Sequence, residues 1–179
     1  MAADPQLAIL LSNLKASPND PLDLCSLGRF YIGYGEIKKA ELYFKQALAK
    51  NRAYWHGYTG LSEVYLYKNE FKKAEEEALK VLNYAPELKG HVYSIIGRIR
   101  FHAQDYSGAE AMLNKSIENN DPSRAYYAHA LLGQLYIREG KLKDAEEELV
   151  RARSSQKDHA EIDELAMKIE RYKRINRAH

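Results

Sequence analysis

The stretch "GEIKKAELYFKQAL", residues 35 to 48, returns three more times along the chain in altered form. The aligned copies are "NEFKKAEEEALKVL" (69–82), "QDYSGAEAMLNKSI" (104–117) and "GKLKDAEEELVRA" (140–152). Each copy carries an alanine at the same place, and these alanines are spaced by 34, 35 and 36 residues: Ala40, Ala74, Ala109 and Ala145. Loops tolerate growth by single residues and helices do not, so the sequence predicts four copies of one unit whose loops differ in length.

Each unit contains two helical patterns. In the first unit, apolar or small residues lie at i, i+3, i+4 and i+7 on a first helix: Leu24, Leu27, Gly28 and Tyr31. A second helix repeats this spacing with Ala40, Phe44, Ala47 and Leu48. The polar segment "GYGE" between them predicts a short turn. The unit is therefore expected to be helix–turn–helix, with one buried face on each helix.

The third unit departs from the others at two places. Its turn holds Gln104 where the others hold Gly35, Asn69 and Gly140, residues that adopt the left-handed conformation at the end of a helix at lower cost. Its first helix carries Arg100 where the others carry tyrosine. Burial of that charge would be costly, so we expect Arg100 to be partly exposed with its stem packed on apolar neighbours.

The four units resemble the tetratricopeptide repeat (TPR), a helix–turn–helix of 34 residues with the pattern W-x2-L-G-x2-Y, then A-x3-F, then P. Counted from Pro21, Trp55, Gly90 and Tyr126, the leucine–glycine pair reads Leu27-Gly28, Leu61-Ser62, Ile96-Gly97 and Leu132-Gly133. The following tyrosine is present in three units as Tyr31, Tyr65 and Tyr136. The resemblance implies an all-α fold, a right-handed α-solenoid of antiparallel helix pairs.

The repeat period also predicts the organisation of the whole chain. The expected parts are an N-terminal helix or half repeat (1–20), four repeats (21–54, 55–89, 90–125 and 126–159) and a C-terminal capping helix (160–179). The N-terminal helix is expected to face inward with Leu7, Leu11 and Leu14. The capping helix is expected to shield the last repeat with Ile162, Leu165, Ala166, Ile169 and Tyr172. Lys168, Arg171 and Arg174 are expected to face away.

Bulk composition excludes several classes of protein. The formal net charge is +2 with 29% charged residues, so no overall field marks a nucleic-acid binder. The single cysteine, Cys25, rules out an intramolecular disulfide. The first residues have no basic n-region and too short an apolar run for a signal sequence or a membrane span. We expect a cytoplasmic chain without direct membrane insertion, or a periplasmic or membrane-associated one if a signal or anchor precedes this sequence.

The sequence contains no catalytic motif. It has no Gly-rich phosphate loop, no G-x-S-x-G and no H-E-x-x-H. The acidic runs 75–77 and 146–148 are expected on solvated outer faces of second helices. His91 and His102 share a helix face but are separated by about 16 Å of helical rise, too far to bind one metal ion. We therefore expect no enzyme, no cofactor, no metal and no small-molecule substrate.

The resemblance implies that first helices line a concave groove. Positions 2, 5, 9, 12 and 13 of each unit form the stripe opposite the buried face. The candidate ligand-binding residues on this stripe are Arg29, His56, Glu63, Tyr67, His91, Arg98, Phe101, His102, Tyr127, Gln134 and Arg138. Arginine and aromatic residues dominate over a single acid. Such a surface favours a partner protein segment that is acidic or amphipathic, because arginine binds carboxylates in bidentate fashion.

One well-known groove mode of the family, the clamp that grips a C-terminal carboxylate of chaperones, is not matched. Its lysine, asparagine and arginine positions hold other residues here, namely Cys25, Arg29, Gly60, His91 and Ile95. The sequence therefore gives no support to a role as a chaperone cofactor.

The leading hypothesis is a non-enzymatic adaptor or scaffold that binds another protein or peptide segment in its groove. A second hypothesis is a structural scaffold that self-associates into a homo-oligomer, through a terminal helix that is imperfectly covered. A third assigns nucleic acid to the arginine–aromatic groove or to the tail "KIERYKRINRAH". The balanced charge argues against that third hypothesis, and the amphipathic pattern already explains the tail as a cap.

Overall fold

The structure is a computed structural model that describes residues 4–119, 125–155 and 159–177. Within these residues all regular secondary structure is helical. The chain divides by its internal contacts into two compact units, Met1–Pro86 and Glu87–His179. The prediction of an all-α chain built from antiparallel helix pairs is confirmed. The repeat boundaries at residues 21, 55, 90, 126 and 160 stay a prediction.

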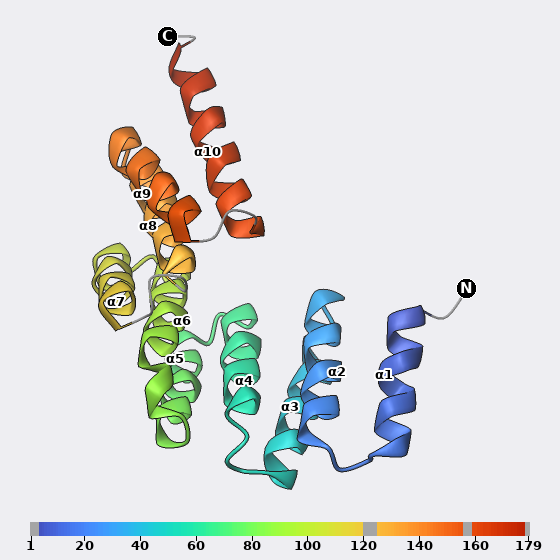
Figure 1. Ribbon diagram of the computed structural model, residues 1–179. Helices are drawn as coiled ribbons and strands as arrows, with labels where there is room; N and C mark the ends of the chain where they lie inside the picture. The colour runs from blue at the N-terminus through green and yellow to red at the C-terminus, as the bar shows by residue number, and fades with distance from the viewer. Residues whose placement is uncertain (1–3, 120–124, 156–158, 178–179) are drawn as a thin grey trace. The chain divides into compact units, whose positions relative to one another are not determined.

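The first unit contains the helices α1 to α5, followed by a short 3₁₀ turn. Their bounds are α1 Pro5–Ala16, α2 Pro21–Gly33, α3 Ile37–Lys50, α4 Trp55–Tyr67, α5 Phe71–Lys80 and the 3₁₀ turn Val81–Asn83. Figure 1 shows α1, α2 and α4 side by side, with α3 packed against both α2 and α4. The second helix of one pair, α3, thus also packs against the first helix of the next pair, α4.

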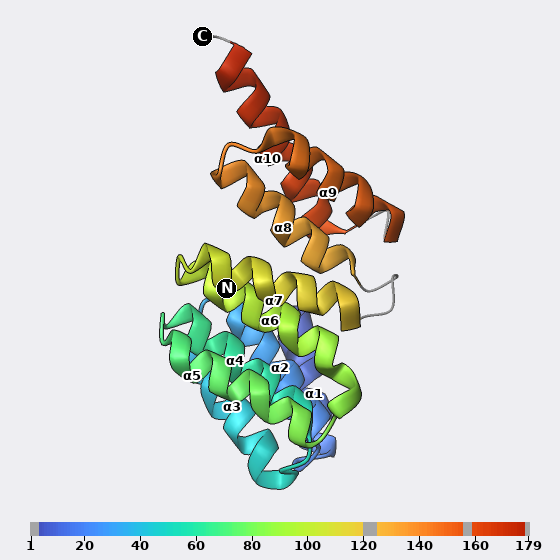
Figure 2. The same ribbon diagram turned by 90° about the vertical axis from the view of Figure 1, so that its left-hand side faces the viewer.

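The second unit contains the helices α6 to α10, and the 3₁₀ turn Pro86–Leu88 comes directly before α6. The bounds are α6 Lys89–His102, α7 Tyr106–Asn119, α8 Tyr126–Arg138, α9 Leu142–Ser155 and α10 Ala160–Arg177. Figure 2 shows α7 beside α8 and α9 lying along α8. The helix α8 contacts α6, α7, α9 and α10, so it is the central element of this unit.

The core of the first unit is organised around Phe44 of α3. Its side chain is fully buried, and it lies against Gly28 of α2 and Gly60 of α4. A Cβ atom added at Gly28 would be 2.7 Å from the Phe44 ring, and one at Gly60 would be closer still. Three helices can therefore meet at one aromatic ring only because two of them have no side chain there. Gly28 is the small residue of the leucine–glycine pair in the first repeat, whereas Gly60 lies two residues before the equivalent Ser62.

The second unit repeats this contact with leucines. A Cβ atom at Gly97 of α6 would lie 2.7 Å from Leu113 of α7. The equivalent Gly133 of α8 meets Leu165, which comes from α10 rather than from α9. Ile162 and Leu165 of α10 are fully buried and Ile169 nearly so, which confirms the predicted inward stripe of the capping helix.

Four similar turns join the paired helices. Each has one residue in the left-handed conformation, at Gly35, Asn69, Gln104 and Gly140. The next residue donates its N–H to the carbonyl of a residue in the last turn of the preceding helix, as Glu36 does to Tyr31 and Asp105 does to Arg100. Gln104, with φ of 63°, adopts the same conformation as the glycines despite its Cβ, because the hydrogen bonds require it. Arg100 is half-buried, as expected.

The helix pattern assigns Leu11 and Glu148 wrongly. Leu11 of α1 is 44% exposed, and Leu10 is half-buried instead, because α1 contacts only one side of α2 and turns Leu7, Leu10 and Leu14 toward it. Glu148 does not lie on a solvated outer face. It is 4% exposed and accepts from Arg151, while His129 Nδ1 lies 2.7 Å from its carboxylate. The hydrogen bonds replace the water that this buried charge loses.

The contact of Phe44 with two glycines predicts the effect of adding a methyl group. We expect Gly60→Ala to lower the free energy of unfolding by about 1 kcal/mol, since overpacking costs about 1–3 kcal/mol and the helix propensity of alanine returns about 1 kcal/mol. The loss should shrink in the Phe44→Leu background. Urea unfolding followed by the fluorescence of Trp55, the single tryptophan, measures this in the same unit.

Gly33 provides the matched control for this substitution. It lies in α2, and no atom is within 4 Å of an added Cβ. Gly33→Ala should therefore raise stability or leave it unchanged. A Gly60→Ala variant that is as stable as Gly33→Ala would contradict the packing described for Phe44.

Candidate functional site

The second unit has a hollow of about 420 Å³ on the side where α6, α8 and α10 meet. Six of the residues predicted from the groove stripe line it: Arg98, Phe101, His102, Tyr127, Gln134 and Arg138. The other lining residues come from the turn after α6, from α7, from α8 and from α10: Gln104, Tyr106, Leu131, Glu161, Glu164 and Lys168. We call this hollow the α6–α8–α10 pocket.

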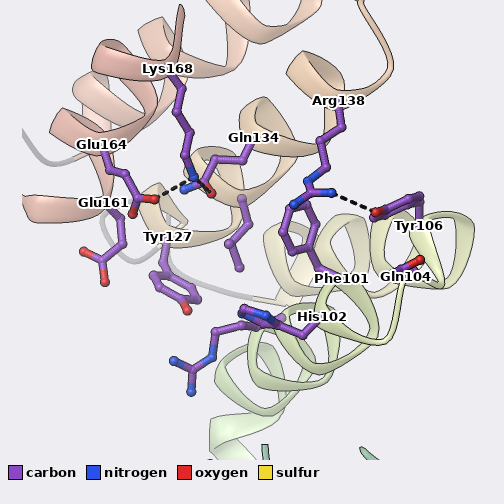
Figure 3. A pocket seen from close by; sticks show the side chains of 12 residues that line it. Phe101, His102, Gln104, Tyr106, Tyr127, Gln134, Arg138, Glu161, Glu164 and Lys168 are labelled. Atoms are coloured by element: carbon purple, nitrogen blue, oxygen red, sulfur yellow. Dashed lines mark hydrogen bonds and ion pairs between the residues drawn. The ribbon is translucent and has the colours of Figure 1, made fainter. Parts of the chain in front are cut away.

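Arg138, at the end of α8, is held at one wall of the pocket by aromatic groups. Its Nη1 donates to the Tyr106 hydroxyl at 3.0 Å, as drawn in Figure 3. Its guanidinium carbon lies 5.2 Å from the centre of the Phe101 ring and 5.8 Å from that of Tyr106. These contacts orient the guanidinium without neutralising its charge, so it remains available to an anionic ligand.

Lys168 lies at the opposite wall, and its predicted direction is wrong. It was expected to face away from the packed stripe, but its Nζ donates to Gln134 Oε1 at 2.7 Å and lies 2.6 Å from Glu164 (Figure 3). The cause is the packing of α10 on α8, which brings the flank of α10 to the pocket. Gln134 is only 7% exposed, so the Lys168 ammonium satisfies its carbonyl oxygen.

His102 stands at the rim of the pocket, at the end of α6. Partial desolvation by the pocket wall lowers the pKa of its imidazole, and the positive charges of Arg98, Arg138 and Lys168 lower it further. All three charges oppose protonation, so the imidazole is mainly neutral at pH 7. The clustering of these groups makes the rim electropositive even without a charge on His102.

Sequence reasoning missed the acidic residues of the pocket. Glu161 and Glu164 come from the first two turns of α10, and neither is among the predicted ligand-binding residues. Glu161 is paired with His159, whose Nε2 lies 2.9 Å from the hydroxyl of Tyr126 on α8. A signal was present in the sequence, because Glu161, Glu164 and Lys168 lie on one face of α10 at spacings of three and four residues.

The other five predicted residues are not part of this pocket. His91 is exposed near the start of α6. His56 stacks on Trp55 with ring centres 3.5 Å apart, Glu63 is half-buried on α4, and Tyr67 is exposed at the end of α4. Arg29 is exposed on α2 and lines a separate open hollow of about 510 Å³ beside α1, together with Phe30 and Tyr34.

Among the residues that the structure describes, no group of three histidines, cysteines or acids could hold a metal ion. Cys25 is fully buried, and burial raises the pKa of its thiol to about 11, which keeps it protonated at neutral pH. None of the helices in the described part of the chain is long and apolar enough to cross a bilayer.

Comparisons by sequence find no match, either to a model of a known protein family or to a curated protein. Comparisons by structure do find similar proteins. A thermophilic TPR protein of Thermus thermophilus is similar with a TM-score of 0.78 and 22% identity, over 91% of this chain and 88% of its own. A TPR protein from Parabacteroides merdae is similar with a TM-score of 0.77 and 18% identity, over 89% of this chain and 61% of its own.

A third similar structure is YrrB, described as a TPR protein with an unusual peptide-binding site. Its TM-score is 0.57 with 20% identity, over 97% of this chain and 86% of its own. At these identities the likeness concerns the fold. The antiparallel helix pairs, the small-to-large contacts between them and these structural matches agree that this chain has the tetratricopeptide-repeat fold.

Proposed function

We propose that the protein is a non-enzymatic adaptor that binds a short acidic or amphipathic segment of a partner protein in the α6–α8–α10 pocket. The observation that carries this proposal is the gathering of Arg98, Arg138 and Lys168 around one hollow. An arginine that is preoriented by aromatic rings loses little entropy when it binds a carboxylate. The same fold supports a peptide-binding site in YrrB.

The composition of the pocket supports a peptide rather than a small metabolite. Charged and aromatic side chains from four helices surround a hollow open to solvent, and Leu131 and Phe101 offer apolar contact. Aromatic and arginine side chains are typical of residues that dominate protein interfaces. Binding of one segment to such a surface is expected to be micromolar, on the order of −8 kcal/mol.

Self-association is the second candidate function. Ile9 and Leu11 on α1 are 62% and 44% exposed, and Leu22 on α2 is also exposed. Apolar side chains in neighbouring helices can form an interface between two copies of a chain.

Charge reversal tests the adaptor function. In affinity purification from the native source, proteins retained by the unchanged chain should be lost with Arg98→Glu/Arg138→Glu. The dissociation constant for the retained partner should rise at least about tenfold, because the reversed charges repel its carboxylates. Titration calorimetry at low and at moderate salt measures this, and the salt dependence should fall as well.

The matched control is Arg171→Glu/Arg174→Glu, two exposed arginines of α10 that do not line the pocket. This control should retain the partner. Equal binding by both double variants would exclude the pocket as the site. Light scattering of the same samples separates the two functions, because a mass that grows with concentration, with no partner retained, would favour self-association.

The electrostatics of His102 give a prediction that needs no partner. Its pKa, followed by the ring proton shifts in NMR, should lie below 6.5, the ordinary value. Arg138→Gln should raise this pKa, since a positive charge that disfavours the imidazolium form has been removed. Arg171→Gln should leave the pKa unchanged. A His102 pKa at or above the ordinary value in the unchanged chain would show that the cations do not act together at the pocket.

A further inference from the structure

The α6–α8–α10 pocket has two walls of different charge. Arg98 and His102 belong to α6 and Arg138 to α8, whereas Glu161 and Glu164 belong to α10. Figure 3 shows Arg138 on one side of the hollow and both glutamates on the other. Both carboxylates of the pocket therefore come from α10, which also supplies Lys168, whereas α6 and α8 supply cations and no carboxylate.

The wall formed by α8 keeps a positive charge at Arg138. The contacts of Arg138 are a hydroxyl and two ring faces, none of which carries a negative charge. His102 adds a polar ring that is mainly neutral at pH 7. A carboxylate on a ligand is the group that this wall attracts most strongly.

The wall formed by α10 keeps a negative charge. Glu164 is neutralised by Lys168, at 2.6 Å. Glu161 is paired with His159, a partner that offsets its charge only when the imidazole is protonated. Among the charged side chains of α10 that line the pocket, the two carboxylates of Glu161 and Glu164 outnumber the single ammonium of Lys168, and this excess would repel an acid and attract a base.

A purely acidic segment fits only one of these walls. With His102 neutral, the pocket is lined by three cations and two carboxylates, which gives a net charge of +1: Arg98, Arg138, Lys168, Glu161 and Glu164. This net charge is not spread evenly over the two walls. We infer that the partner segment carries both an acid and a base, with its acid at Arg138 and its base at Glu161. This inference rests on the proposed function, and it replaces an acidic segment by one of mixed charge in a fixed direction.

Selection from a random-peptide phage library on the full chain tests the inference. Retained peptides should share one Asp or Glu and one Lys or Arg at a constant spacing. Selection on Glu161→Gln should lose the basic position, and selection on Arg138→Gln should lose the acidic one. Two exposed residues of α10 outside the pocket supply the controls, Glu170→Gln and Arg171→Gln, and these should keep both positions.

A synthetic peptide from the selection gives the quantitative arm. Changing its base to glutamate should weaken binding to the unchanged chain at least about tenfold, and to Glu161→Gln by about twofold or less. Because Glu161 also contacts His159, far-UV circular dichroism must show an unchanged helix content for this variant. If the content changes, Glu164→Gln, which releases the Lys168 charge into the same wall, should produce the same loss of the basic position.

The outcomes separate this inference from the proposed function. Retained peptides that are purely acidic, or a basic position that persists in both glutamate variants, would overturn the mixed-charge segment and leave the adaptor function standing. Failure to retain any peptide, or retention that is unaffected by Arg138→Gln as well as by Glu161→Gln, would overturn binding in this pocket itself.

Discussion

The rest of the structure depends on one constraint, the close approach of neighbouring helices. A small residue on one helix allows this approach, and a large side chain from the next helix fills the space between them. Phe44 lies between Gly28 and Gly60, and Leu113 lies against Gly97. These contacts fix which face of each first helix is buried. Part of the opposite face then carries arginine and aromatic residues, and Arg98, Phe101 and Arg138 of this face line the pocket.

This constraint explains why the fold could be predicted from the sequence. The alanines spaced by 34 to 36 residues and the small residue in each first helix both reflect one helix pair that packs on copies of itself. The turns were less predictable from residue type, since Gln104 adopts the left-handed conformation that glycine takes elsewhere. There the hydrogen bonds of the turn outweigh the local preference of the residue.

The candidate site was predictable only where it lies on first helices. Arg98 and Arg138 follow from their positions in the repeat, because the packed stripe determines the stripe opposite to it. Glu161 and Lys168 do not, since α10 lies outside the four predicted repeats. Its helical pattern distinguishes only a packed face from a solvated face. In the structure α10 packs on α8 and places Leu165 against Gly133, so its flank borders the pocket. Leu11 and Glu148 were misassigned for a similar reason, because helix phase does not say which neighbour covers a residue.

The central claim is that partners bind in the α6–α8–α10 pocket, and photo-crosslinking in the native source tests it most directly. A benzoylphenylalanine at Tyr127 keeps an aromatic ring in the pocket, and the same group at Val150 lies on the outer side of α9, where the side chain is 68% exposed. The account predicts a partner adduct from position 127 that Arg138→Glu abolishes, and no adduct from position 150. Adducts from position 150 alone, or equal adducts from both positions, would contradict it.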